Sequence, residues 1–160
     1  MPPLLALDAS VELAGPMGTR RLALPDFLLG PRRTALAKAE VMTAILIPAK
    51  VLTGRSAFLK LGARAHLVIS IVMAAANIDS HAGRITAARL AIGSCGPVAT
   101  RLAHLESALI GRPVQDAPTL VTDAALSTAL APIDDIRATA AYRLSAATEL
   151  LRRAIAGCAA

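Results

Sequence analysis

Hydrophobic and polar positions alternate with a period of two in several short stretches of the chain. In residues 56–61 small and branched apolar side chains fall on one side of this alternation, and the other side carries Lys60. Residues 68–76 are apolar on both sides, which is typical of a buried strand covered by helices. Residues 84–92 alternate again after a turn at residues 79–83, so the three stretches predict a three-stranded antiparallel sheet.

A period of 3.6 residues replaces this alternation in the last third of the chain. Apolar stripes predict three helices, over residues 97–110, 118–131 and 139–156. Three helices laid on one face of a three-stranded sheet give an α+β sandwich.

The first fifty residues contain only short alternating runs separated by glycine and proline. These runs predict strands over residues 4–14, 19–24 and 40–47, and no long helix. The sequence therefore predicts two parts, a small antiparallel strand-rich piece in residues 1–52 and the α+β sandwich in residues 56–157.

Composition and charge exclude two classes of partner. The 160-residue chain is only 2% aromatic, and its net charge of +6 comes from basic residues spread along the whole length. Binding to nucleic acid needs stacking rings or a basic cluster, so we expect no nucleic-acid partner. The longest uncharged run in the core, residues 67–78, is shorter than the ~20 residues that span a bilayer, and the N-terminus lacks the basic region of a signal peptide. We expect a cytoplasmic protein without a membrane span.

The sequence shows no spacing typical of a nucleophile–base pair or of a metal site. The two cysteines lie far apart, and the three histidines have no helical ligand spacing, so we expect no catalytic residue and no bound metal. The adjacent acids Asp134 and Asp135 are expected to start a helix or to pair with Arg137 or Arg143.

Lys60 is the one candidate binding residue that the sequence pattern indicates, because it lies between two strongly apolar segments. A buried ammonium without a partner is costly, so its side chain must reach solvent, an anionic ligand or a carbonyl-rich ligand. Spacing alone does not decide between a lysine that extends to water and one that binds a ligand.

Several motifs occur in a recognisable order. At the centre lies Phe58-x-Lys60-x-x-x-Arg64, followed by Ile69-x-x-Val72. The other motifs are residues 2–9, Leu24-Pro25-Asp26-Phe27, Gly30-Pro31 with Thr34, residues 40–48, residues 89–94 with Pro97, residues 132–138, and Ala141-Tyr142-Arg143. Together they resemble the FAD-binding subunit of the molybdenum hydroxylases, the family of xanthine and carbon monoxide dehydrogenases, over essentially the whole chain.

The resemblance implies that the chain is the C-terminal portion of this FAD-binding subunit and that the chemistry belongs to the cofactor. Lys60 matches a position that contacts FAD, and Met42 occupies the place of an apolar residue that packs on FAD. The family's upstream glycine-rich loops, which hold the FAD pyrophosphate on backbone amides, have no match in this sequence. The resemblance therefore implies a truncated chain with a partial FAD site, inactive by itself.

Partner subunits are implied in the same way: a molybdopterin-binding large subunit and a small subunit with 2Fe–2S clusters. Electrons would pass from the iron–sulfur clusters through FAD to an acceptor, which makes the chain a component of an oxidoreductase. One residue departs from the family pattern, because Val68 stands where an aspartate is usual. Since this removes a negative charge close to the flavin ring, the alternative is a non-catalytic subunit-interaction domain that kept the fold and no longer binds flavin.

Overall fold

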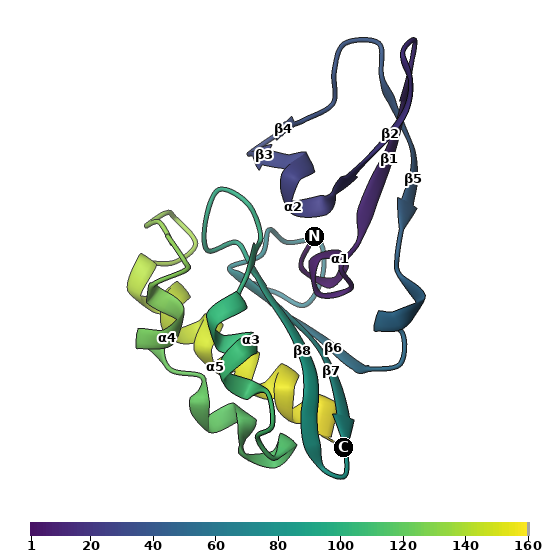
Figure 1. The fold of residues 1–160 in the computed structure, drawn as a ribbon. Helices are drawn as coiled ribbons and strands as arrows, with labels where there is room; N and C mark the ends of the chain where they lie inside the picture. The colour runs from purple at the N-terminus through teal and green to yellow at the C-terminus, as the bar shows by residue number, and fades with distance from the viewer. Residues whose placement is uncertain (160) are drawn as a thin grey trace.

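The computed structural model describes residues 1–159, which form two antiparallel sheets and a layer of helices (Figure 1). The smaller sheet lies in the N-terminal part, and the larger sheet carries helices on one face and the N-terminal part on the other. This arrangement confirms the predicted α+β fold class.

The smaller sheet has the strand order β2-β1-β5. A second pair, β3-β4, lies beside it, and short helical turns connect the strands. The bounds of these elements are α1 Pro2–Ala6, β1 Ser10–Gly15, β2 Gly18–Ala23, α2 Leu24–Phe27, β3 Leu28–Gly30, β4 Arg33–Thr34, β5 Val41–Leu46 and the 3₁₀ turn η1 Ala49–Val51.

The predicted strand over residues 4–14 is wrong in its first half. Residues Pro2–Ala6 form helix α1, and the strand begins only at Ser10. Pro2 and Pro3 occupy the first helical positions, where the fixed φ of proline favours a helix start. Asp8 then adopts a left-handed backbone conformation (φ 48°), which separates the helix from the strand.

The larger sheet has the order β6-β7-β8-β9 and is antiparallel throughout. Its strands are β6 Arg55–Leu61, β7 Val72–His81, β8 Arg84–Gly93 and β9 Thr100–Arg101. The sheet thus contains the three predicted strands and a short fourth one. The central strand begins at Val72 rather than at residue 68, because residues 62–71 form a loop between β6 and β7.

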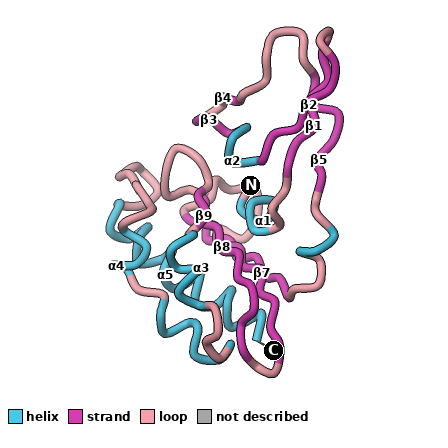
Figure 2. The backbone as a smooth tube through the Cα atoms, in the orientation of Figure 1, coloured by secondary structure: helices cyan, strands magenta, loops and turns pink. Residues whose placement is uncertain are grey.

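One face of this sheet is covered by helices, which gather on the same side in Figure 2. They are α3 Ala103–Leu109, the 3₁₀ segment η2 Val114–Leu120, α4 Asp123–Ser127 and α5 Ala140–Ala159. The long helix α5 packs against β6 and β7, and the fully buried Leu151 and Ile155 belong to the core between them. No helix among residues 1–159 is both long and apolar enough to cross a membrane.

The last predicted helix is confirmed by α5, whereas the two before it are shorter than predicted. Residues 97–102 contain the strand β9, so α3 begins only at Ala103. The predicted helix over residues 118–131 is divided between η2 and α4, because Pro118 lies inside the first segment and Thr122 caps the second. Proline removes a backbone donor, and the cap satisfies a free amide at a new helix start.

The opposite face of the larger sheet packs against α1 and the smaller sheet. A second core cluster joins Leu5 of α1 and Leu13 of β1 to Ala75 of β7 and Ala91 of β8. The approach is close, since a Cβ added at Gly93 would lie 2.8 Å from the Cγ atom of Pro2. The N-terminal part is therefore fixed onto the sheet by direct packing.

Candidate functional site

Lys60 lies near the end of β6, the edge strand of the larger sheet. The alternating residues of β6 that face the helices are Ala57, Leu59 and Leu61, which pack against the helix-side core. Lys60 therefore lies on the other face, and its cross-strand partner is Met73. This is the face that carries α1 and the smaller sheet, as the position of α1 in Figure 1 shows.

The ammonium of Lys60 donates a hydrogen bond to the carbonyl oxygen of Val68 at 2.9 Å. The side chain thus ties strand β6 to the loop of residues 62–71, hereafter the β6–β7 loop. A second cation in this loop, Arg64, donates to the carbonyl oxygen of Leu67 at 2.5 Å. Both cations are used to shape the loop, and both residues remain exposed to solvent.

Met42 lies on β5 of the smaller sheet, where its cross-strand partner is the fully buried Leu13. Its side chain is 48% exposed, and the same strand exposes Val41 and Ile45. Large apolar side chains exposed along one strand are typical of a surface that another group covers. Met42 and Lys60 come from different sheets, and neither belongs to a core cluster within the described residues.

The residues present fit one end of a flavin, and the phosphate end finds no counterpart among them. A flavin ring needs an apolar surface and a donor, which exposed Phe58 and the ammonium of Lys60 offer from the same face of β6, whereas Met42 belongs to the other sheet. The glycines with left-handed backbone in residues 1–159 lie at turns: Gly18 and Gly83 in hairpins and Gly111 after α3. None of them opens a helix that could cradle a pyrophosphate on its amides.

The two adjacent acids behave as predicted. Asp135 pairs with Arg137 at 2.8 Å and with Arg143 at 2.7 Å, and Asp134 accepts a hydrogen bond from the backbone amide of Ala140 at the start of α5. The backbone amide of Arg137 and the two guanidinium groups outweigh the effect of burial, so the pKa of Asp135 lies well below its ordinary value. This cluster is ionised at neutral pH and holds the loop before α5 to the helix.

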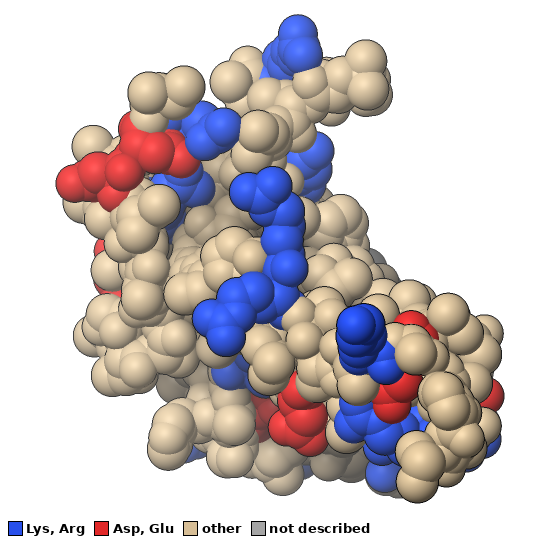
Figure 3. Space-filling view, turned by 90° about the horizontal axis from the view of Figure 1, so that it is seen from above, with Lys and Arg blue, Asp and Glu red and all other residues tan. Residues whose placement is uncertain are grey.

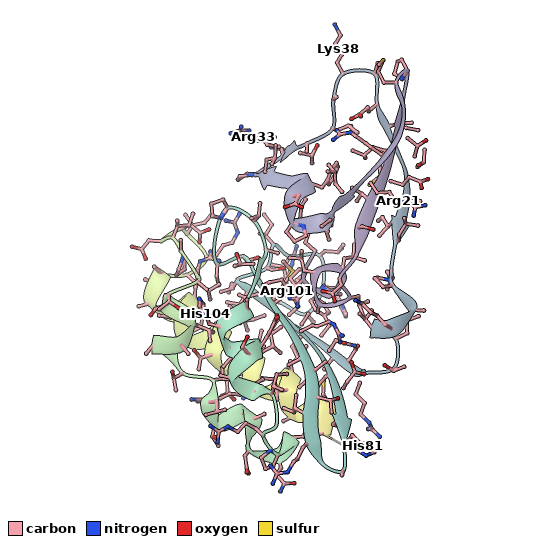
Figure 4. The ribbon with its side chains drawn as sticks, viewed as in Figure 1. Arg21, Arg33, Lys38, His81, Arg101 and His104 are labelled. Atoms are coloured by element: carbon pink, nitrogen blue, oxygen red, sulfur yellow. The ribbon has the colours of Figure 1, made fainter. Side chains whose placement is uncertain are left out.

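A larger ion network joins the N-terminal part to the larger sheet, and no pattern in the sequence predicts it. Asp8 accepts hydrogen bonds from Arg101 at 2.6 Å and from Arg89 at 3.0 Å. Arg89 also pairs with Asp79, and Arg101 with Glu106. Figure 4 shows Arg101 beside the N-terminal helix, where the two parts meet.

The charge of Asp8 is held by these partners. Burial raises the pKa of Asp8, but the hydrogen bonds and charges of Arg101 and Arg89 outweigh it and leave the pKa below its ordinary value. Asp8 therefore has two roles: its backbone separates α1 from β1, and its carboxylate binds Arg89 and Arg101 of the larger sheet.

Within residues 1–159, the remaining His, Cys, Asp and Glu side chains form no cluster of metal-ligating groups. Cys95 and Cys158 are buried, at 2% and 4% exposure. Within residues 1–159 no three His, Cys, Asp or Glu side chains are grouped closely enough to hold a metal ion. Figure 3 shows basic side chains spread over one face of the molecule with acidic ones between them.

Comparison with known families assigns most of the chain. Residues 57–157 match the family described as CO dehydrogenase flavoprotein C-terminal domain. Residues 1–50 match the family described as FAD binding domain in molybdopterin dehydrogenase.

Individual proteins agree with these matches. The chain is 36% identical to the nicotinate dehydrogenase FAD-subunit of Eubacterium barkeri over 113 residues, 68% of this chain and 38% of that protein. It is 31% identical to the carbon monoxide dehydrogenase medium chain of Hydrogenophaga pseudoflava over 157 residues, 94% of this chain and 52% of that one. Its fold superposes on CO dehydrogenase from Oligotropha carboxidovorans with a TM-score of 0.89 and 28% identity, over 98% of this chain and 55% of that chain. The chain thus spans about half the length of such relatives, or less.

Proposed function

The chain belongs to the FAD-binding subunits of the molybdopterin dehydrogenases, and we propose that it forms one side of a flavin site in such a complex. The observation that carries the proposal is the position of Lys60, whose ammonium lies on the face of the sheet that bears the N-terminal part. In this proposal Lys60 contacts the flavin, and Met42 packs against it through its exposed thioether chain.

The two parts of the chain correspond to two subdomains of such a subunit in this proposal. We propose that residues 1–52 belong to the second subdomain of the FAD-binding region and that residues 56–157 form the C-terminal subdomain. The separate core clusters on the two faces of the larger sheet support this division. The pyrophosphate would be held by polypeptide outside the residues described here.

The bound flavin supplies the redox chemistry, and this chain supplies its position. A molybdopterin-binding large subunit and an iron–sulfur small subunit are the proposed partners, with electrons reaching FAD from the clusters and leaving to an acceptor. The names of the relatives from Eubacterium barkeri and Hydrogenophaga pseudoflava, an FAD-subunit and a medium chain, support this assembly. Its location in the cytoplasm stays a prediction from the sequence.

A second candidate function is a subunit-interaction domain that no longer binds flavin. Val68 favours it, because an apolar side chain stands beside the carbonyl that Lys60 binds, and the β6–β7 loop lacks a carboxylate. The ammonium of Lys60 is also partly satisfied without any ligand. Both candidates predict the same fold and the same partners and differ only in flavin content.

The test is the flavin content of the complex isolated by an affinity tag on the chromosomal copy of this chain. We expect visible flavin absorbance and acid-releasable FAD in a ratio of one per chain. The Lys60→Met variant should lose FAD, whereas Lys38→Met, which changes an exposed lysine in the loop before β5, should keep it. A complex that assembles with both partners and contains no flavin would establish the interaction domain instead.

A further inference from the structure

Arg143 is the only charged residue that is buried within the part of the chain that the structure describes, with 3% of its surface exposed. It lies in the first turn of α5, in the helix layer that covers one face of the larger sheet. Burying a guanidinium is costly unless its hydrogen-bonding groups find partners. The contacts of Arg143 must therefore offset this cost, and they indicate what the residue does.

The guanidinium of Arg143 joins three loops at one end of the larger sheet. Its Nη1 atom donates to the carbonyl oxygen of Ile71 at 2.6 Å and to that of Ser94 at 3.2 Å. Its Nη2 atom donates to the carboxylate of Asp135 at 2.7 Å. Ile71 is the last residue of the β6–β7 loop, Ser94 follows β8, and Asp135 precedes α5. One side chain thus fixes these loops relative to one another.

The backbone of Ile71 is held on two sides. Its amide donates to the carbonyl oxygen of Leu61 at 2.8 Å, where β6 ends. Its carbonyl oxygen accepts the hydrogen bond from Arg143, and its side chain belongs to the helix-side core. The end of the β6–β7 loop is therefore attached both to the edge strand and to α5.

Lys60 holds the same loop three residues earlier, at Val68, and from the other face of the sheet. Arg143 reaches the loop from the helix layer, because α5 packs on the face opposite to α1. The segment of residues 68–71 thus lies between two cations, one on each face. Since only two residues separate Val68 from Ile71, a change that releases Ile71 also releases the acceptor of Lys60.

A lysine at position 143 could not make the same contacts. The guanidinium is planar and presents its donors in fixed, different directions, whereas an ammonium is a compact charge on a flexible stem. An ammonium at the same place would reach one of the three loops and leave the other acceptors without their donor. The exchange of Arg143 for Lys therefore preserves the charge and removes the clamp.

We propose that Arg143 is a positioning residue of the flavin site: by fixing Ile71 it sets the β6–β7 loop and, through Val68, the position of the Lys60 ammonium. This inference rests on the flavin contact proposed for Lys60. Arg143 itself does not touch the flavin, because its side chain is buried and both Nη atoms are bound within the protein. Its effect on the flavin passes through the loop.

The first measurement needs no flavin and follows amide hydrogen exchange, residue by residue, in the purified chain. Arg143→Lys should accelerate exchange at the amide of Ile71 about tenfold, because a hydrogen bond from a charged donor is lost. Exchange at Leu151, in the buried part of α5, should stay unchanged and shows that the variant is folded.

Two further variants make this measurement specific. Arg152→Lys is the matched control, because this arginine of the same helix also donates to a backbone carbonyl oxygen, that of Val121 at 2.9 Å, and should leave exchange at Ile71 unchanged. Asp135→Asn keeps the buried arginine and removes the charge that orients it. Exchange at Ile71 should then rise in the same direction as in Arg143→Lys, but less.

The second measurement uses the complex isolated through the tag on the chromosomal copy. Arg143→Lys should keep one FAD per chain, but the visible circular dichroism of the bound flavin should decrease. FAD should also dissociate about fivefold faster, because Lys60 no longer holds one position. Arg152→Lys should match the unchanged protein in both signals. A merely structural role of Arg143 would lower the melting temperature and leave the two flavin signals as they are.

The outcomes separate this proposal from the one on which it rests. Unchanged exchange at Ile71 in Arg143→Lys overturns the clamp. A complex that contains FAD and shows the same dichroism and release rate in Arg143→Lys as in the unchanged protein overturns the positioning role alone. A complex that assembles without FAD overturns the flavin contact of Lys60, and with it the role of Arg143 at that site.

Discussion

The ammonium nitrogen of Lys60 lies 2.9 Å from the carbonyl oxygen of Val68, eight residues further along the chain. This contact closes the β6–β7 loop across its base, where the edge strand ends. The residue proposed to touch flavin is therefore also the residue that holds the loop in place. Changes at Lys60 should affect the loop even when no flavin is bound.

Replacing Lys60 with Met should loosen the β6–β7 loop. One lost hydrogen bond is worth about 1 kcal/mol, which corresponds to roughly fivefold faster hydrogen exchange at the amide of Ile71, which donates to the carbonyl oxygen of Leu61 at 2.8 Å. Exchange in α5 should not change, because β6 faces that helix through Ala57, Leu59 and Leu61. Lys38→Met is the matched control, and equal exchange in both variants would show that the contact with Val68 does not hold the loop.

Opposite outcomes are expected for two glycine substitutions, one in the β6–β7 loop and one in α5. A Cβ added at Gly62 would lie 2.5 Å from the Cγ1 atom of Val68, so Gly62→Ala should destabilise the chain by about 1–3 kcal/mol. A Cβ added at Gly157, inside α5, would lie 3.5 Å from the Cβ atom of Ala57, so Gly157→Ala should stabilise by about 0.5–1 kcal/mol. Urea unfolding of both variants checks the pair, and a stabilising Gly62→Ala would mean that the loop rearranges freely.

Asp8→Asn should weaken the junction between the N-terminal part and the larger sheet. The change leaves Arg89 and Arg101 without one carboxylate partner each, at side-chain exposures of 12% and 24%. We expect a loss of about 1–3 kcal/mol in the free energy of unfolding. The comparison is Glu149→Gln, which removes the exposed pair with Arg153 and should cost less than about 0.5 kcal/mol. Equal losses in the two variants would contradict a special role for the junction.

Acid should destabilise the chain partly through Glu40. Hydrogen bonds from Arg20 and from the backbone amide of Ala37 lower the pKa of Glu40 from 4.5 to about 2. Because the pKa is lowered in the folded state, its contribution is complete above pH 4.5 and is lost as the pH falls toward about 2. The melting temperature of Glu40→Gln should therefore fall less steeply over this interval than that of the unchanged protein. Parallel slopes would show that the pair with Arg20 does not persist in solution.

Both cysteines should resist modification in the folded protein. Burial raises the pKa of the Cys95 thiol to about 11, even though the charge of Arg143 acts in the opposite direction. Burial likewise raises the pKa of Cys158 to about 11. Since the thiolate is the reactive form, labelling at pH 8 should be slow in buffer and rapid in urea. Fast labelling of either thiol in buffer would indicate local opening at that position.

Local alternation predicted the strand that carries the candidate site. The side chains of Ala57, Leu59 and Leu61 face the core, so the position of Lys60 on the opposite face followed from the period of two alone. The resemblance added Met42 and the ligand, and the contacts of both residues with FAD stay predictions. Alternation failed at residues 4–14, because a short helix and a short strand joined at Asp8 produce the same apolar spacing as one long strand.

The ion network could not be predicted, because the residues that form it are far apart in the sequence and share no local pattern. Asp8 lies 93 residues from Arg101 and 81 from Arg89. Only the packing of α1 onto β8 brings the three together, and that packing depends on tertiary contacts.

The central strand β7 carries alanine where most sheets carry larger residues. Ala74 and Ala76 face the helices and Ala75 faces α1, and all three are at most 1% exposed. Because alanine side chains are single methyl groups, the helix layer and the N-terminal part can both pack closely against the backbone of β7. One added methylene on either side would consequently push helix α5 and helix α1 apart. These three positions should therefore tolerate little increase in side-chain size.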